Sequence, residues 1–296
     1  MIASYALRLV CLSLAVFLLV HTIAGMIAGA MAPAVLRLAE RMRPRNATRL
    51  LLAMRLLPAA AASFIVAVVC VPSYLRLEPE GGAEEIGWLC VIAAAVALAM
   101  WGGALLNLAR ALVRSSRFAR HCERTGAPVL MLTGILRPRL VVSRTIREAL
   151  SAEQLDAALG HEQAHRRAHD NLKRLLLAGT PRLPGFASLE RGWSRMSEWA
   201  ADDESVAGDS GRALCLADAL VRVARLGAVP AEVSFLGDGR DLARRVERLL
   251  HPRAYGERSA GILAGAALGV AAVAMAAVAQ GQSLETAHRV MEYLVR

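Results

Sequence analysis

Paired cysteines are missing from this sequence. The chain has five scattered cysteines and no Cys-x-x-Cys pair among them (Cys11, Cys70, Cys90, Cys122 and Cys215). The sequence therefore gives no support to a disulfide framework or to a thiolate zinc site. Aromatic residues are few, at 4% of the chain, and no aromatic platform or basic recognition helix accompanies the net charge of +10. We therefore expect no direct binding of nucleic acid.

Charged residues are absent from four long apolar runs, at about residues 9–36, 56–75, 86–109 and 260–279. Each run reaches the roughly 20 residues that a helix needs to cross about 30 Å of hydrocarbon. Buried soluble helices are one alternative. A cleaved signal peptide is an alternative for the first run, although the apolar core of a signal peptide spans only about 7–15 residues. Four charge-free runs of this length favour four transmembrane helices.

Arginines indicate how these helices cross the membrane. Six lie between the first and second runs and four follow the third, whereas the loop between the second and third runs holds four glutamates and one arginine. Because positive flanks stay in the cytoplasm, we expect both termini outside an inner (plasma) membrane and residues 110–258 inside. The positive charge also suits contact with anionic membrane lipids.

The cytoplasmic segment 110–258 is long enough for one domain. Two β-type runs, 129–132 and 136–142, flank Thr133-Gly134 and predict a hairpin. A capping box of Ser151 and Gln154 predicts the start of a helix over about 152–177. Further helices are expected over about residues 188–206, 213–226 and 241–250.

The predicted fold is mainly α. Residues 1–109 form three transmembrane helices, and a cytoplasmic α+β domain (110–258) is inserted before a fourth membrane helix (259–280) and a short extracytoplasmic tail (281–296). Gly25 and Gly29 form a GxxxG pattern in the first membrane helix, and residues 261–269 form a double one in the fourth. These patterns favour close helix packing, either within the chain or in a homodimer, although lipid-facing filler is the alternative.

Residues 161–165 read His-Glu-Gln-Ala-His. On a helix, His161 and His165 lie on one face and can bind the same metal, and Glu162 can reach a water beside it. A chance match on a solvated helix face is the alternative. Zinc is the metal that this ligand chemistry favours, with three protein ligands in catalytic sites.

A downstream residue has to supply the third ligand. Glu198 is the best candidate, because its helix follows the first after a Pro/Gly loop, and Asp202 lies four residues later on the same face. The Asp202 carboxylate can accept the outer N–H of a ligating imidazole. A solvated acidic face is the alternative. His169 is a rival ligand, but on a straight helix it drifts about 80° from His161.

Several segments together resemble the membrane metallopeptidases of the BlaR/MecR type, signal transducers that trigger inactivation of a cytoplasmic repressor. The resemblance is carried by segments 134–140 (GILRPRL), 161–170 (HEQAHRRAHD) and 198–202 (EWAAD), and more weakly by 216–220 and 245–250. Three membrane helices before the domain and one after it fit the same type. The segment 177–188 is more polar than expected, and residues 280–296 leave no room for the antibiotic-binding domain of the antibiotic sensors.

The resemblance implies a gluzincin-like site in which His161, His165 and Glu198 hold one Zn²⁺ per chain. It implies Glu162 as the catalytic base and Asp202 as a support for a ligand. It also implies a strand that an extended substrate can join, formed by Arg139, Leu140, Val141 and Val142.

These expectations favour a membrane-embedded zinc endopeptidase that cleaves a cytoplasmic or membrane-proximal protein substrate, such as a transcriptional repressor, in signal transduction. A quality-control peptidase of the HtpX type is an alternative, although that type places two membrane helices before the zinc motif. A non-catalytic receptor on a peptidase scaffold is a third reading, and the presence of Glu162 argues against it.

Overall fold

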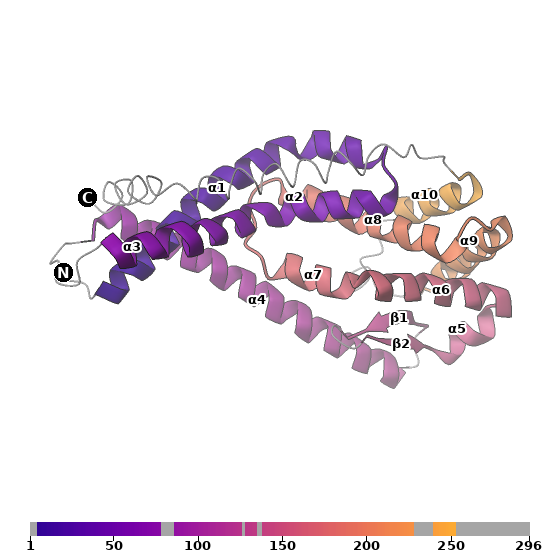
Figure 1. Cartoon of the computed structure of the whole chain (residues 1–296). Helices are drawn as coiled ribbons and strands as arrows, with labels where there is room; N and C mark the ends of the chain where they lie inside the picture. Colours follow the sequence, from indigo (N-terminus) through magenta and orange to yellow (C-terminus); the bar gives the residue numbers. More distant parts are fainter. Residues whose placement is uncertain (1–4, 78–85, 126–127, 135–137, 228–238, 253–296) are drawn as a thin grey trace.

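The computed structural model describes residues 5–77, 86–125, 128–134, 138–227 and 239–252, and this part of the chain is mainly helical (Figure 1). The membrane-like helices are α1 (Tyr5–Ala39), α2 (Pro44–Ile65), α3 (Val71–Leu77) and α4 (Trp88–Thr125), with a π-helix (Val66–Cys70) between α2 and α3. The rest comprises β1 (Leu130–Thr133), β2 (Arg139–Val142), α5 (Arg144–Ala149), α6 (Ala152–Ala168), α7 (Asp170–Ala178), α8 (Phe186–Val206), α9 (Ser210–Arg225) and α10 (Gly239–Leu250).

Three stretches of helix in the described residues are long and apolar enough to cross a membrane. They are Tyr5–Ala39, Pro44–Leu77 and Trp88–Arg117. These helices contain the first three predicted runs, and α4 continues past its run to Thr125. The predicted fourth membrane helix, 259–280, lies outside the described residues, so it stays a prediction.

The predicted hairpin is present. Strands β1 and β2 pair antiparallel, with Leu130 opposite Val142 and Thr133 opposite Arg139. Ser143 follows β2, and its hydroxyl accepts a hydrogen bond from the backbone N–H of Ile146, so the same residue that ends the strand starts α5. The hairpin is thereby tied to the helical part of the domain.

The helix that carries the histidine motif begins as predicted and ends earlier. Both hydrogen bonds of the capping box at Ser151 and Gln154 are present, and α6 begins at Ala152. The expected single helix to residue 177 is wrong, because His169 adopts a left-handed backbone conformation with φ of 56° and separates α6 from α7. No glycine or proline marks this break. The side chain of Asp170 stabilises it by turning back to His165, at a distance of 2.8 Å.

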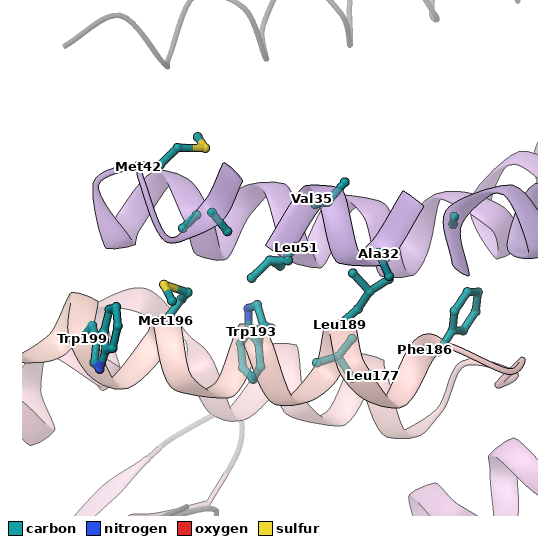
Figure 2. Packing of buried hydrophobic residues seen from close by; sticks show 13 residues of the cluster. Ala32, Val35, Met42, Leu51, Leu177, Phe186, Leu189, Trp193, Met196 and Trp199 are labelled. Atoms are coloured by element: carbon teal, nitrogen blue, oxygen red, sulfur yellow. The ribbon is translucent and has the colours of Figure 1, made fainter. Parts of the chain in front are cut away.

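Helix α8 packs against the membrane-like helices on one side and against α6 and α9 on the other. Its apolar side chains repeat at helical spacing and pack on α1 and α2, as Figure 2 shows for Phe186, Leu189, Trp193 and Met196. All four are at most 2% exposed. At about 25 cal/mol per Å² of apolar surface, burying side chains of this size contributes several kcal/mol to holding α8 in place. The domain is therefore not simply appended to the membrane helices.

The GxxxG pattern of α1 receives a loop of the same chain. A Cβ built on Gly25 would lie 2.1 Å from Cδ1 of Leu183, and one built on Gly29 would lie 3.0 Å from the backbone oxygen of Pro184. This face of α1 therefore contacts the α7–α8 loop of the same chain. A homodimer through the glycine-rich membrane helices stays a prediction. The other glycine pattern, 261–269, lies outside the described residues.

Candidate metal centre

Two helices bring the three predicted ligands together. His161 and His165 lie one turn apart on α6, and their Nε2 atoms are 3.1 Å apart. Glu198 on α8 places Oε2 3.5 Å from Nε2 of His161 and Oε1 3.5 Å from Nε2 of His165. Helix α8 therefore has two functional faces, one apolar toward α1 and α2 and one acidic toward α6.

The three ligand groups are close enough together to bind one zinc ion. The Nε2 atoms of the two imidazoles are 3.1 Å apart, and each lies 3.5 Å from a different oxygen of Glu198. One ligand atom from each residue lies within 4.8 Å of the other two, so a small movement of the Glu198 carboxylate brings them to the spacing of about 3.4 Å around a tetrahedral metal. The side chains are enclosed, since His161 and His165 are each 7% exposed. Two neutral imidazoles and one carboxylate leave the fourth tetrahedral position for a water.

Asp202 lies next to the Nδ1 atom of His161, on the side of the ring away from the other ligands. This Nδ1 lies 2.9 Å from Oδ1 of Asp202, although the angle is poor for a hydrogen bond. The Asp202 carboxylate also accepts hydrogen bonds from Nη2 and Nε of Arg245, at 2.7 and 2.9 Å. Burial would raise the pKa of Asp202, but the charges and hydrogen bonds of Arg245 and His161 together outweigh it and lower that pKa to about 2. Asp202 therefore stays ionised beside the metal ligand.

His165 has a support that the sequence did not reveal. Its Nδ1 lies 2.8 Å from Oδ2 of Asp170, and Lys173 Nζ lies 3.0 Å from the other oxygen of Asp170. On the straight helix that we expected, a residue five positions after His165 would face another direction. The left-handed backbone at His169 redirects the chain and brings Asp170 back, while the His169 side chain itself is exposed and lies away from the ligands.

Each imidazole is thus oriented by its own buried carboxylate. Burial would lower the pKa of His165, but the charge of Glu198 and the hydrogen bond to Asp170 outweigh it and raise that pKa to about 10. The pKa of His161 is also raised, because Asp202 and Glu198 outweigh burial. Carboxylates in these positions increase the basicity of imidazoles toward a metal as well as toward a proton.

Glu162 points toward the hairpin. Its Oε2 accepts a hydrogen bond of 3.1 Å from the backbone N–H of Leu132 in β1. Burial raises the pKa of the Glu162 carboxyl, against the opposing charges of His161 and His165. A raised pKa brings a carboxylate closer to the range in which it both accepts and donates a proton near neutral pH. This is the chemical requirement for the role that the resemblance implied.

The hairpin presents β1, rather than β2, to the motif helix. The Leu132 backbone N–H binds Glu162, and the Leu132 carbonyl accepts a hydrogen bond of 3.4 Å from Asn171 on α7. The predicted substrate strand, 139–142, lies on the other side of β1 (Figure 1). Substrate addition at 139–142 stays a prediction, and the edge of β1 is the one closest to the catalytic carboxylate.

Two arginines near Glu198 were also missed as parts of the site. Arg245 on α10 places Nη1 3.1 Å from Oε2 of Glu198, and Arg174 on α7 places Nη2 3.3 Å from Oε1. Arg245 is 4% exposed, which is unusual for an arginine and marks a paired charge. Segment 245–250 contributed to the family resemblance, but nothing in its sequence indicated that Arg245 folds back onto α8.

The comparison with protein families supports the same assignment. Residues 131–225 match the sequence model of peptidase family M48, whose members are metallopeptidases that usually use zinc. The matched segment extends from β1 to the end of α9 and contains His161, Glu162, His165 and Glu198. Comparisons with curated proteins and with solved structures gave no match. The family match supports a metallopeptidase of the gluzincin type and does not single out the BlaR/MecR type.

Proposed function

We propose that this protein is a membrane-embedded zinc endopeptidase that cleaves a cytoplasmic or membrane-proximal regulatory protein. The observation that carries the proposal is the convergence of two imidazole nitrogens and one carboxylate within 4.8 Å of one another, inside a segment that matches a metallopeptidase family. Three helices of membrane-spanning length precede that segment. The regulatory role rests on the resemblance to the BlaR/MecR type.

The mechanism follows from the position of each side chain. A zinc ion held by His161, His165 and Glu198 would polarise the scissile carbonyl and acidify the attacking water. Glu162 accepts a proton from that water as its oxygen attacks the carbonyl carbon. The same carboxyl then donates the proton to the leaving nitrogen as the C–N bond breaks, which yields a carboxylic acid and an amine; the acid's remaining proton is lost to the amine or to solvent. Asp202 and Asp170 keep the two imidazoles oriented during the reaction.

Replacing Glu162 by glutamine tests this assignment. The amide oxygen of glutamine can still accept the hydrogen bond from the Leu132 N–H, so the fold and the zinc content should be unchanged. Cleavage should fall by at least about a hundredfold, because glutamine cannot carry the proton. The measurement compares new protein N-termini in cells that make the wild type or Glu162→Gln, together with the zinc content of both purified proteins.

The number of new termini separates the possible roles. One or two termini that depend on Glu162 would support signalling, whereas dozens would support membrane quality control. Cleavage that survives Glu162→Gln would overturn the mechanism. A phenotype that is lost on deletion of the protein but kept by Glu162→Gln would favour a non-catalytic receptor.

A further inference from the structure

Helix α8 runs parallel to α1, so residues of α1 can be used to estimate how far the metal centre lies from the membrane surface. A Cβ on Gly185 would lie 3.0 Å from Cα of Gly29, and a Cβ on Gly192 would lie 2.3 Å from Cδ2 of Leu36. One turn further along, Arg195 of α8 forms an ion pair of 2.7 Å with Glu40. The two helices are therefore parallel and keep the same relative position along this contact.

The end of the apolar run of α1 marks the position of the membrane surface along this helix. The run ends at Leu36 and the first charged residue after it is Arg37. The level of Leu36, and hence of Gly192 on α8, is therefore the level at which α1 leaves the hydrocarbon. Gly25 and Gly29 lie deeper, within the run. The α7–α8 loop that packs on them lies at hydrocarbon depth.

Helix α4 supports the same level independently. A Cβ on Gly179, at the end of α7, would lie 3.4 Å from Cδ2 of Leu108. The apolar run of α4 ends at residue 109, and Arg110 follows it. The end of α7 therefore lies where α4 leaves the hydrocarbon.

Helix α2 gives a third marker. Arg55 immediately precedes the second apolar run. Its guanidinium binds Oε1 of Glu190 on α8 at 2.8 Å, and it donates a hydrogen bond of 3.2 Å to the Thr180 carbonyl after α7. Three helices thus place the same part of the α7–α8 hairpin, near residues 179–180 and 190–192, at the membrane surface.

The height of the metal centre follows from this level. Glu198 is six residues beyond Gly192 on α8. With a rise of about 1.5 Å per residue, its Cα lies about 9 Å beyond the surface. An extended peptide spans about 10 Å with only three residues. A chain that leaves the membrane beside α8 therefore reaches the three metal ligands within its first few residues.

We infer that the substrate is a protein anchored in the same membrane, cut in the segment that immediately follows its anchor. This inference rests on the proposed peptidase function and narrows its substrate class. Anchoring confines a substrate to the membrane plane and raises its effective concentration at a site of this height.

The height of the site can be measured without any substrate. In the full-length protein with its five cysteines replaced by serine, single cysteines are introduced by Ala187→Cys in the deep part of α8 and by Glu204→Cys beyond the ligand Glu198. Both positions are exposed in the chain itself. In vesicles of phosphatidylethanolamine and phosphatidylglycerol, a membrane-impermeant maleimide should label Glu204→Cys at least about tenfold faster. Equal labelling would overturn the inference.

Cleavage then tests the substrate class. Zinc-loaded wild type and Glu162→Gln are reconstituted in the same vesicles with β-casein, either free or fused behind a single transmembrane anchor. Three fusions begin at different casein residues, so that different sequences follow the anchor. Anchored casein should be cut at least about tenfold faster than free casein, and the cuts should lie within about eight residues of the anchor in all three fusions.

The outcomes distinguish the inference from the function on which it rests. Cuts at the same casein bonds in free and anchored forms, at equal rates, would overturn the inference and leave the peptidase function intact. Absence of any cut that depends on Glu162 would overturn both, whatever the labelling result.

Discussion

The two carboxylates behind the imidazoles are the residue-scale feature that most affects metal binding. Asp202 was predicted from its spacing to Glu198, because residues four apart share a helix face. The contact of Asp170 with His165 was not predicted, because it depends on the left-handed backbone conformation of His169, which is neither glycine nor asparagine. Sequence patterns assign residues to faces of regular helices, so a contact that arises from a break in a helix has no signal in them.

Removing the Asp170 carboxylate should weaken zinc binding. In Asp170→Asn, the partner of the His165 Nδ1 atom loses its charge, and we expect zinc affinity to fall about 10–100-fold. The measurement is a competition with a chelator of known zinc affinity. Asp156→Asn is the matched control, because Asp156 lies on α6, the helix of His165, and pairs with Arg212 on the surface. Equal zinc affinities in the two variants would contradict the role of Asp170.

Zinc binding should also depend steeply on pH. In the metal-free protein the pKa of His165 is raised to about 10 and that of His161 is raised as well, so zinc has to displace protons near neutrality. Protons therefore favour the metal-free form as the pH falls. Each displaced proton changes the binding constant about tenfold per pH unit.

The same chelator competition, repeated between about pH 8 and pH 6, measures this slope, and we expect it to lie between about one and two logarithmic units per pH unit. The control is His251→Gln, which removes an exposed imidazole outside the site and should leave the slope unchanged. A flat profile for the wild type would show that the imidazoles bind zinc without losing protons.

At the scale of elements, a buried arginine connects a membrane helix to the metal-binding helices. Arg55 is fully buried and its guanidinium lies 4.5 Å from the centre of the Phe186 ring, next to its ion pair with Glu190. The sequence showed Arg55 only as one of six positive charges in a loop. Its real partners are more than a hundred residues away in sequence, and no local pattern contains that information.

Replacing Arg55 by methionine should loosen α8 from α2. We expect the free energy of unfolding to fall by about 3 kcal/mol. This is the lower end of the range for breaking a buried ion pair, because Arg182 still pairs with Glu190 in the variant. Unfolding by denaturant in detergent measures it. Arg49→Met, which removes an exposed arginine of the same helix, should change stability little. The double variant with Glu190→Gln should lose less than the two single losses combined.

The helices themselves were largely predictable. The starts or ends of α6, α8, α9 and α10 lie within three residues of the expected positions, except for the break at His169. Capping boxes and charge-free runs predicted these helices correctly because they depend only on residues that are close together in sequence. The close fit of the α7–α8 loop on α1 was not predictable, since a GxxxG pattern indicates a close approach but does not name the partner.

At the scale of the whole molecule, that close approach joins the membrane helices to the peptidase domain. A Cβ at Gly29 would lie 3.0 Å from the backbone oxygen of Pro184, whereas a Cβ at Gly102 on α4 would have no atom within 4 Å. Gly29→Ala should therefore displace the loop and destabilise the protein by about 1–3 kcal/mol, and Gly102→Ala should be neutral. Thermal unfolding and zinc content of the purified variants measure both effects, and equal stability of the two would contradict the packing described here.

The parallel packing of α8 on α1 also has a consequence for biosynthesis. The surface on which α8 rests comes from residues synthesised about 150 positions earlier, on helices that enter the bilayer before the peptidase segment leaves the ribosome. A nascent chain that has not yet paired α1 with α2 lacks that surface, so the apolar face of α8 has nothing to pack on, and only the ion pairs with Arg174 and Arg245 hold Glu198 in place. We therefore expect completion of the metal centre to follow membrane insertion of α1 and α2.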